Sequence, residues 1–401
     1  MTNVGGRRSA SRFFGVWVLS FVFTLSWIGG FMSFACFAQF ASFASSRRVV
    51  RRGVVACAAA LFSVGAAFAD VPKILDAPEG AASITPADAP ALKNPKMKWA
   101  PKNFAKDPSV VRFKGKYYMY FSIPPQEKDG GKYGWTTGIA TSDNLVDWTF
   151  VDNLLPTQEC VKKGFCAPCA RVINDKVYLF YQSYGTGAKD AICMATSDDG
   201  VKFTPHPENP IFRPNGPEWT NGRAIDAEVI FFKGRFLLYA ATRDPEGKIQ
   251  KLVVATADAD SDLGPNAWKQ ACDDSILQPE LPWETKCIEA ATTLERDGKL
   301  YMFYAGGYNN DPQHIGLAVS DDGLVWTRVW DVPFITNGPK GQWNASESGH
   351  PGVFVDDDGQ TWLFFQGNAS KGKDWYLSRV KIDWDAAPGV DGLQVPRLVE
   401  E

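Results

Sequence analysis

The chain has 401 residues, of which 45% are apolar, 22% charged and 13% aromatic, and its formal charge is -3. This composition excludes a disordered chain, a coiled coil and a collagen-like repeat. The slightly acidic balance gives no attraction to phosphate backbones, so we expect no nucleic-acid partner, and only three His disfavour a His-rich metal enzyme.

The first part of the chain is typical of export signals. Residues 13–46 are apolar and uncharged, which is long enough to cross a bilayer. The Arg-rich segment 47–52, the apolar run 54–68 and a small-residue cleavage site then form a complete secretory signal. Because tandem targeting segments are unusual, we expect the true start downstream, at Met32, with a membrane anchor as the alternative. We therefore divide the chain into a targeting region, residues 1–69, and one domain, residues 70–401, that is secreted or periplasmic and meets a membrane only through the targeting segment.

Six cysteines follow the predicted cleavage site. In an oxidising compartment the local pairing possibility is Cys160 with Cys166 or Cys169. Cys166 and Cys169 have CxxC spacing, but no second pair follows and no helix is expected beside them, so we interpret them as structural.

One sequence shape occurs five times along the domain. Each copy is an apolar run, a tight turn and an aromatic-rich strand, and the residues after the turns are spaced 59 to 64 positions apart. The turns are Lys-Gly, Asn-Asp or Asp-Gly, which are typical of β-hairpins. The five copies are residues 108–122, 170–183, 227–241, 290–307 and 351–367.

A second repeat follows the hairpins. It consists of a strand, a Ser-Asp turn and an outer strand with an aromatic residue, at residues 139–151, 191–206 and 315–329, with a variant at 252–268. Four strands per unit, repeated five times, fill residues 95–400 and predict an all-β fold, a five-bladed β-propeller. No segment has a sustained helical period, so an α/β barrel is excluded.

Polar residues open the first strand of four of these units. In a propeller that strand lines the central channel, so we expect equivalent positions at one mouth for Asp107, Ala167, Asp226, Glu289 and His350. Converging carboxylates suit glycoside hydrolysis, in which one acid carries a proton and another is ionised. The alternative is that these acids cap the blade ends or bind calcium.

The motifs at these positions resemble glycoside hydrolase family 43, whose relatives, families 32, 62 and 117, share the five-bladed propeller. They are Lys106-Asp107-Pro108-Ser109, Ala167-Pro168, Ile225-Asp226-Ala227, Ile288-Glu289-Ala290 and Gly349-His350. The resemblance implies that Asp107 is the general base, Asp226 the orienter and pKa modulator, and Glu289 the general acid. It places His350 low in the channel with a water or a structural cation, and implies no required cofactor and no catalytic metal.

The chain also departs from that family. Cys166 replaces an aromatic residue, and Ala290-Ala291 replace a Gly-Pro pair, so a pentose substrate is not assumed. Arg243-Asp244-Pro245 is similar to a family 32 motif but follows the second strand of its unit, so we interpret it as without function.

For the remaining candidate substrate-binding residues, a purely structural role is the alternative. Glu347 is a rival acid, a sugar-hydroxyl acceptor or a solvated loop charge, and Glu228 contacts substrate or pairs with Arg223. Four tryptophans are expected on loops around the mouth, to stack on sugars or to pack: Trp135, Trp219, Trp283 and Trp343.

These observations predict an exported, inverting glycoside hydrolase acting on oligosaccharides derived from polysaccharides. Inversion requires the carboxyl groups of Asp107 and Glu289 to be about 6.5–9.5 Å apart. A phosphorylase on the same scaffold and a non-catalytic glycan-binding propeller are the alternatives.

Overall fold

The computed structural model describes residues 104–125 and 132–399, together with four short strands near the start of the chain. The chain divides into two units, Met1–Ala66 and Ala67–Glu401. In the first unit β1 (Val22–Phe23) pairs with β4 (Cys36–Phe37), and β2 (Trp27–Ile28) pairs with β3 (Phe31–Met32). The expected targeting region otherwise lies outside the described residues. Within the described part of the chain, no helix has the length and apolar character needed to cross a bilayer.

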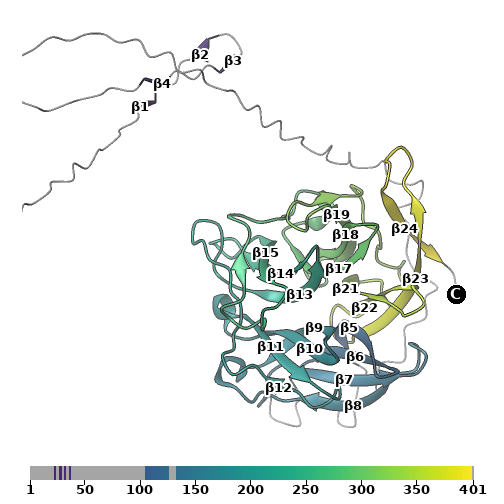
Figure 1. The fold of residues 1–401 in the computed structure, drawn as a ribbon. Coiled ribbons are helices and arrows are strands. Elements are labelled where there is room, and N and C mark those ends of the chain that lie inside the picture. Colours follow the sequence, from purple (N-terminus) through teal and green to yellow (C-terminus); the bar gives the residue numbers. More distant parts are fainter. Residues whose placement is uncertain are drawn as a thin grey trace, which may run out of the picture. The chain divides into compact units, whose positions relative to one another are not determined.

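The second unit contains five antiparallel sheets of four strands each, and in every sheet the strand order is the chain order. Their innermost strands lie around a common centre (Figure 1). This is the predicted five-bladed β-propeller.

The strands of each blade follow one another along the chain. Blade one is β5 (Lys106–Phe113), β6 (Lys116–Ile123), β7 (Thr136–Ser142) and β8 (Thr149–Leu154); blade two is β9 (Phe165–Ile173), β10 (Lys176–Ser183), β11 (Ile192–Ser197) and β12 (Thr204–Pro205). Blade three is β13 (Ile225–Phe232), β14 (Arg235–Arg243), β15 (Gln250–Asp258) and β16 (Lys269–Gln270); blade four is β17 (Ile288–Arg296), β18 (Lys299–Gly306), β19 (His314–Ser320) and β20 (Thr327–Arg328); blade five is β21 (Glu347–Val355), β22 (Thr361–Asn368), β23 (Tyr376–Ala386) and β24 (Gln394–Val399).

Hydrophobic clusters fill the spaces between adjacent blades. On β14, Leu238 packs into the cluster shared with blade two, while the next residue, Tyr239, packs into the cluster shared with blade four. Successive strand residues point to opposite faces, so a strand buried on both faces must be apolar throughout. This is why the second strands are continuous apolar runs in the sequence. A further cluster joins Phe364 of blade five to Val110 of blade one and closes the ring.

The turns have the geometry that their sequences predict. Lys114 and Gly115 have φ angles of 49° and 79°, and Asn174 and Asp175 have 49° and 59°. Positive φ at both central residues belongs to the type I′ turn that matches strand twist. The Ser-Asp turns are also confirmed, since Asp199 Oδ1 accepts hydrogen bonds from the backbone N–H groups two and three residues later.

The six described cysteines are unbonded. Cys166 and Cys169 are buried in β9, while Cys160 lies in the short 3₁₀ helix η3 (Glu159–Val161). The local possibility, a disulfide of Cys160 with either of them, is not formed in this structure. Two further 3₁₀ helices are η4 (Gly187–Lys189) and η5 (Pro282–Glu284).

Candidate active site

A β-bulge near the start of every innermost strand builds the mouth. In each of the five blades the register between the first and second strands shifts once, and the residue at the shift has a left-handed backbone. Asp and His enter this region more readily than most residues, and a bulge redirects the side chain that it carries. The φ angles are 55° at Asp107, 48° at Ala167, 53° at Asp226, 53° at Ala290 and 45° at His350.

Glu289 does not occupy the position expected for it. The left-handed residue of blade four is Ala290, whereas Glu289 precedes the bulge and pairs with Ala305. Its counterparts in blades one and two are Lys106 and Cys166. The expected equivalence holds for Asp107, Ala167, Asp226 and His350 but is wrong for Glu289. The pocket is therefore lined from both positions in blades one and three and from one of the two in each other blade.

At three bulges, a side-chain oxygen from the neighbouring blade accepts a hydrogen bond from the backbone N–H. The N–H of Asp107 donates to Gln366 Oε1 at 3.0 Å, and the N–H of Asp226 donates to Gln182 Oε1 at 2.6 Å. The N–H of Ala167 likewise donates to Ser122 Oγ at 2.8 Å. Each acceptor belongs to the second strand of the preceding blade, so contacts between blades fix the two aspartates.

These positions surround a cavity of about 130 Å³. About 10–15 Å³ is enough for one water, so the cavity has room for a larger ligand. Five of the predicted site residues line it: Asp107, Asp226, Glu289, His350 and Trp135. Three cationic side chains share the lining: Lys106, Arg223 and Arg243.

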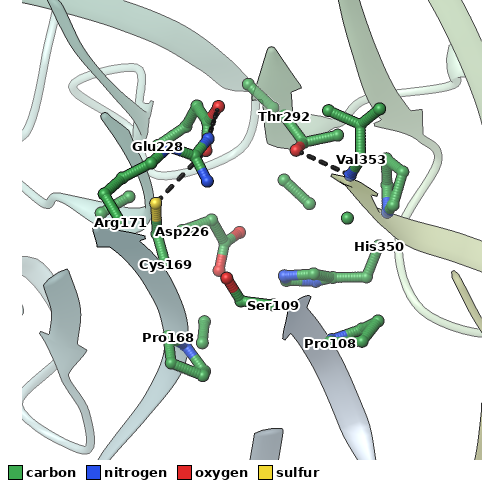
Figure 2. Close-up of a pocket in the computed structure, with 16 residues that line it drawn as sticks. Pro108, Ser109, Pro168, Cys169, Arg171, Asp226, Glu228, Thr292, His350 and Val353 are labelled. Carbon is green, nitrogen blue, oxygen red and sulfur yellow. Dashed lines mark hydrogen bonds and ion pairs between the residues drawn. The ribbon is translucent and has the colours of Figure 1, made fainter. Parts of the chain in front are cut away.

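A second, smaller space of about 20 Å³ lies in the channel and shares Asp226 and His350 with the mouth pocket. Figure 2 shows these two side chains directed into the channel, with Glu228 and Arg171 along its wall. The volume suits about one water molecule. Among residues 104–125 and 132–399, no group of three or more His, Cys, Asp or Glu side chains could hold a metal ion.

Asp107 is the pocket carboxylate most strongly held in its ionised form. Burial raises its pKa, but the charges of His350 and Lys106 and a hydrogen bond from Ser122 outweigh this and leave the pKa below its ordinary value. His350 Nδ1 lies 3.1 Å and Lys106 Nζ 3.9 Å from Asp107 Oδ1. An ionised carboxylate is what a general base requires.

Asp226 and Glu289 have a different environment. Burial and the negative charges of Glu289 and Asp107, opposed by the charge of His350, together raise the pKa of Asp226 to about 7. Glu289 accepts hydrogen bonds from the side-chain amides of Gln250 and Gln313 on its two oxygens. Asp226 therefore keeps a proton up to near-neutral pH while Asp107 remains ionised.

Five other candidates do not line the mouth pocket: Glu347, Glu228, Trp219, Trp343 and Trp283, which packs against Tyr304. Glu347 is fully buried behind it, where its oxygens accept from the Asn310 N–H at 2.6 Å and from Gln366 Nε2 at 2.9 Å. Burial raises its pKa to about 7. Trp219 is in the cluster between blades two and three, and Trp343 packs against Phe365, 5.7 Å between ring centroids.

Glu228 lies in the channel wall. It is ion-paired with Arg171 and accepts from Thr293 Oγ1 at 2.7 Å. The expected pairing with Arg223 is wrong, because Arg223 bonds to Asp190 from blade two.

Sequence reasoning missed the three cations of the pocket. Lys106 precedes the bulge of blade one, as Glu289 precedes that of blade four. The equivalence of these two positions is the signal that could have identified Lys106 as a pocket residue. Arg243 ends β14 and lines the pocket, so its interpretation as a residue without function is wrong. Arg223 comes from the loop before β13 and had no recognisable signal.

Comparison with known proteins agrees with this geometry. The family model "Glycosyl hydrolases family 43" matches residues 94–386. The fold is similar to that of a solved thermostable family-43 glycoside hydrolase, with a TM-score of 0.57 and 20% identity over 77% of this chain and 95% of that one.

Two curated relatives match shorter stretches. A beta-xylosidase of Xylanibacter ruminicola is 30% identical over 109 residues, 27% of this chain and 31% of that protein. A xylosidase/arabinosidase 43A of Humicola insolens is 34% identical over 88 residues, 22% of this chain and 24% of that protein. The matched stretches thus span less than a third of either relative.

Proposed function

The chain belongs to glycosyl hydrolases family 43, and from this we propose that it cleaves glycosidic bonds in oligosaccharides derived from polysaccharides. The observation that carries the proposal is that one pocket holds a carboxylate kept ionised, Asp107, together with Asp226, which keeps a proton near neutral pH, and Glu289. Hydrolysis needs both forms at once, one to activate water and one to protonate the leaving oxygen.

The roles follow from the surroundings of each carboxylate. Asp107, beside His350 and Lys106, takes the proton of the attacking water. Glu289 delivers a proton to the glycosidic oxygen, and Gln250 and Gln313 hold its carboxyl group in place. Asp226, which lines the same pocket, orients Glu289. His350 orients Asp107 and a water in the channel below.

Two finer features belong to the proposal. The reaction inverts the anomeric configuration, which nuclear magnetic resonance of the first product formed would test directly. The enzyme is exported, and residues 1–69 are removed from the secreted or periplasmic form. N-terminal sequencing of the protein from the culture medium or periplasm would test this, with a start near Asp70 expected.

The test of the function is sugar release by the purified protein from plant and algal oligosaccharides and from aryl glycosides. Glu289→Gln should lower turnover of unactivated substrates by about 10²–10⁴-fold and spare aryl glycosides with good leaving groups. Glu295→Gln is the matched control, because Glu295 is exposed at the other end of the same strand.

Other outcomes separate the remaining functions. Equal loss on both substrate classes would contradict the assignment of Glu289 as the acid. Cleavage that depends on added phosphate would identify a phosphorylase. Sugar binding without any release would identify a glycan-binding propeller.

A further inference from the structure

Three fixed cations line the mouth pocket, and two of them have carboxylate partners. Lys106 Nζ lies 3.9 Å from Asp107 Oδ1. Arg223 donates from Nε and Nη2 to Asp190 Oδ2, both at 3.2 Å. Arg243 forms no ion pair with any described residue within 4.0 Å, although it lies in the same lining. One positive charge of the pocket is therefore without a direct counterion in the part of the chain that the structure describes.

The orientation of Arg243 is fixed by its neighbours. Its Nε donates to Gln250 Oε1 at 2.9 Å, and its guanidinium carbon lies 5.6 Å from the ring centroid of Tyr308. The two Nη groups have no hydrogen-bond partner among the described residues, and neither is enclosed away from solvent. A guanidinium held through Nε alone presents its paired Nη donors to whatever fills the pocket.

Arg223 adds a second positive charge on the same side. Burial raises the pKa of the Tyr308 hydroxyl, and the charges of Arg243 and Arg223 both act to lower it. Tyr308 also lines the pocket, so the two arginines and this aromatic ring form one wall. The Asp107 carboxylate and the neighbouring His350 imidazole are contributed by blades one and five.

We propose that this wall recognises an anionic sugar, a glycosyl unit with a uronic-acid carboxylate, and that Arg243 is the specificity-determining residue. A guanidinium binds a carboxylate through two parallel N–H···O bonds, which are charge-assisted and therefore stronger than bonds to neutral hydroxyls. The inference rests on the proposed function and narrows its substrate class. It also accounts for a cation that has no ion pair among residues 104–125 and 132–399.

A purely positional role for Arg243 makes a different prediction. Gln250 connects Arg243 to Glu289, so Arg243 could act only by orienting the acid through this amide. Loss of that role would lower kcat for every substrate alike. Loss of carboxylate recognition would instead weaken the binding of acidic sugars and leave neutral sugars unaffected.

The experiment is isothermal titration of the full protein with matched monosaccharides. The probes are D-galacturonate and D-glucuronate, their neutral counterparts D-galactose and D-glucose, D-galactose 6-sulfate, and inorganic phosphate. The uronates should bind about tenfold more tightly than the neutral sugars, and Arg243→Gln should remove this difference. Arg235→Gln is the control, because Arg235 begins the strand that Arg243 ends and lies at the hairpin.

Three results would overturn the proposal. They are equal affinity for neutral and acidic sugars, preference for the sulfate ester over the uronates, and tight phosphate binding together with phosphate-dependent cleavage. Binding is measured without turnover, so this test is separate from that of the function. Arg243-dependent uronate binding without any hydrolysis would refute the hydrolase and retain the inference, whereas hydrolysis of neutral glycosides alone would do the reverse.

Discussion

The mouth pocket and a cluster inside blade four both contain buried carboxylates, but in opposite environments. In the blade-four cluster, formed by Glu280, Glu284, Tyr304 and Arg328, Glu284 is fully buried. It accepts from Arg328 Nε at 2.7 Å, from the Tyr304 hydroxyl at 2.8 Å and from the Leu281 N–H at 2.9 Å. Every oxygen of Glu284 is occupied by a donor of the chain.

The pocket acids have fewer partners. Asp226 and Glu289 have no cationic side chain within 4.0 Å among the described residues, and both face a cavity. A buried carboxylate whose oxygens are all paired has a structural role. The attraction between the carboxylate and its cationic partner offsets the cost of removing the two charges from water. A carboxylate without such a partner is available to a substrate, and burial raises the pKa of Asp226. The contacts thus distinguish Glu284 from Asp226 and Glu289, whereas Asp107 faces the pocket with two cationic neighbours.

The largest expected effect is in the blade-four cluster. Arg328→Met leaves the Glu284 charge buried and unpaired, so the free energy of unfolding should fall by about 3–5 kcal/mol. Chemical denaturation would measure this, and the pH profile of activity at low temperature should remain unchanged. A loss below about 1 kcal/mol would contradict the distinction between the two regions.

A smaller effect concerns pH. Folded Asp226 keeps its proton up to about pH 7, whereas its ordinary pKa is 3.8. The folded state therefore binds more protons between these values, and the free energy of unfolding should fall as the pH rises from about 4 to 7. Glu347, whose pKa is also raised to about 7, contributes with the same sign.

Substitution of Asp226 or Glu347 should reduce the dependence of stability on pH. Asp226→Asn and Glu347→Gln should each flatten the decline of Tm between pH 4.5 and 7.5, and Glu295→Gln should leave it as in the wild type. Scanning calorimetry would measure this, and parallel curves for all four proteins would contradict the pKa assignments.

The smallest expected effect compares two tryptophans. Trp135 lines the pocket, so Trp135→Ala should raise KM about fivefold, from the loss of roughly 1 kcal/mol of aromatic contact with the sugar. Trp219 is in the core, so Trp219→Phe should leave KM unchanged and lower the free energy of unfolding by about 1–3 kcal/mol. A raised KM in Trp219→Phe and an unchanged KM in Trp135→Ala would instead place the sugar against Trp219.

The architecture was predictable because its signals are local. Tight-turn residues and apolar second strands recur in each unit and Ser-Asp turns in three of them, and each reflects contacts within one hairpin or with adjacent blades. The acids Asp107 and Asp226 were identified for the same reason, since the repeat places them at one position of two blades. Membership of a glycosidase family is consistent with these motifs.

The sequence by itself therefore determined the number of blades, their hairpins and the acids of the mouth. Only the tertiary structure decided which side chains meet there. The bulge makes the residue before the left-handed position face the pocket, as Glu289 and Lys106 do. The alternation of side chains along a regular strand does not predict this orientation. Ring closure decided the rest, because the partners of Arg223, Glu228 and Trp219 lie on neighbouring blades. Contacts between residues tens of positions apart depend on how the blades pack, and no local pattern encodes them.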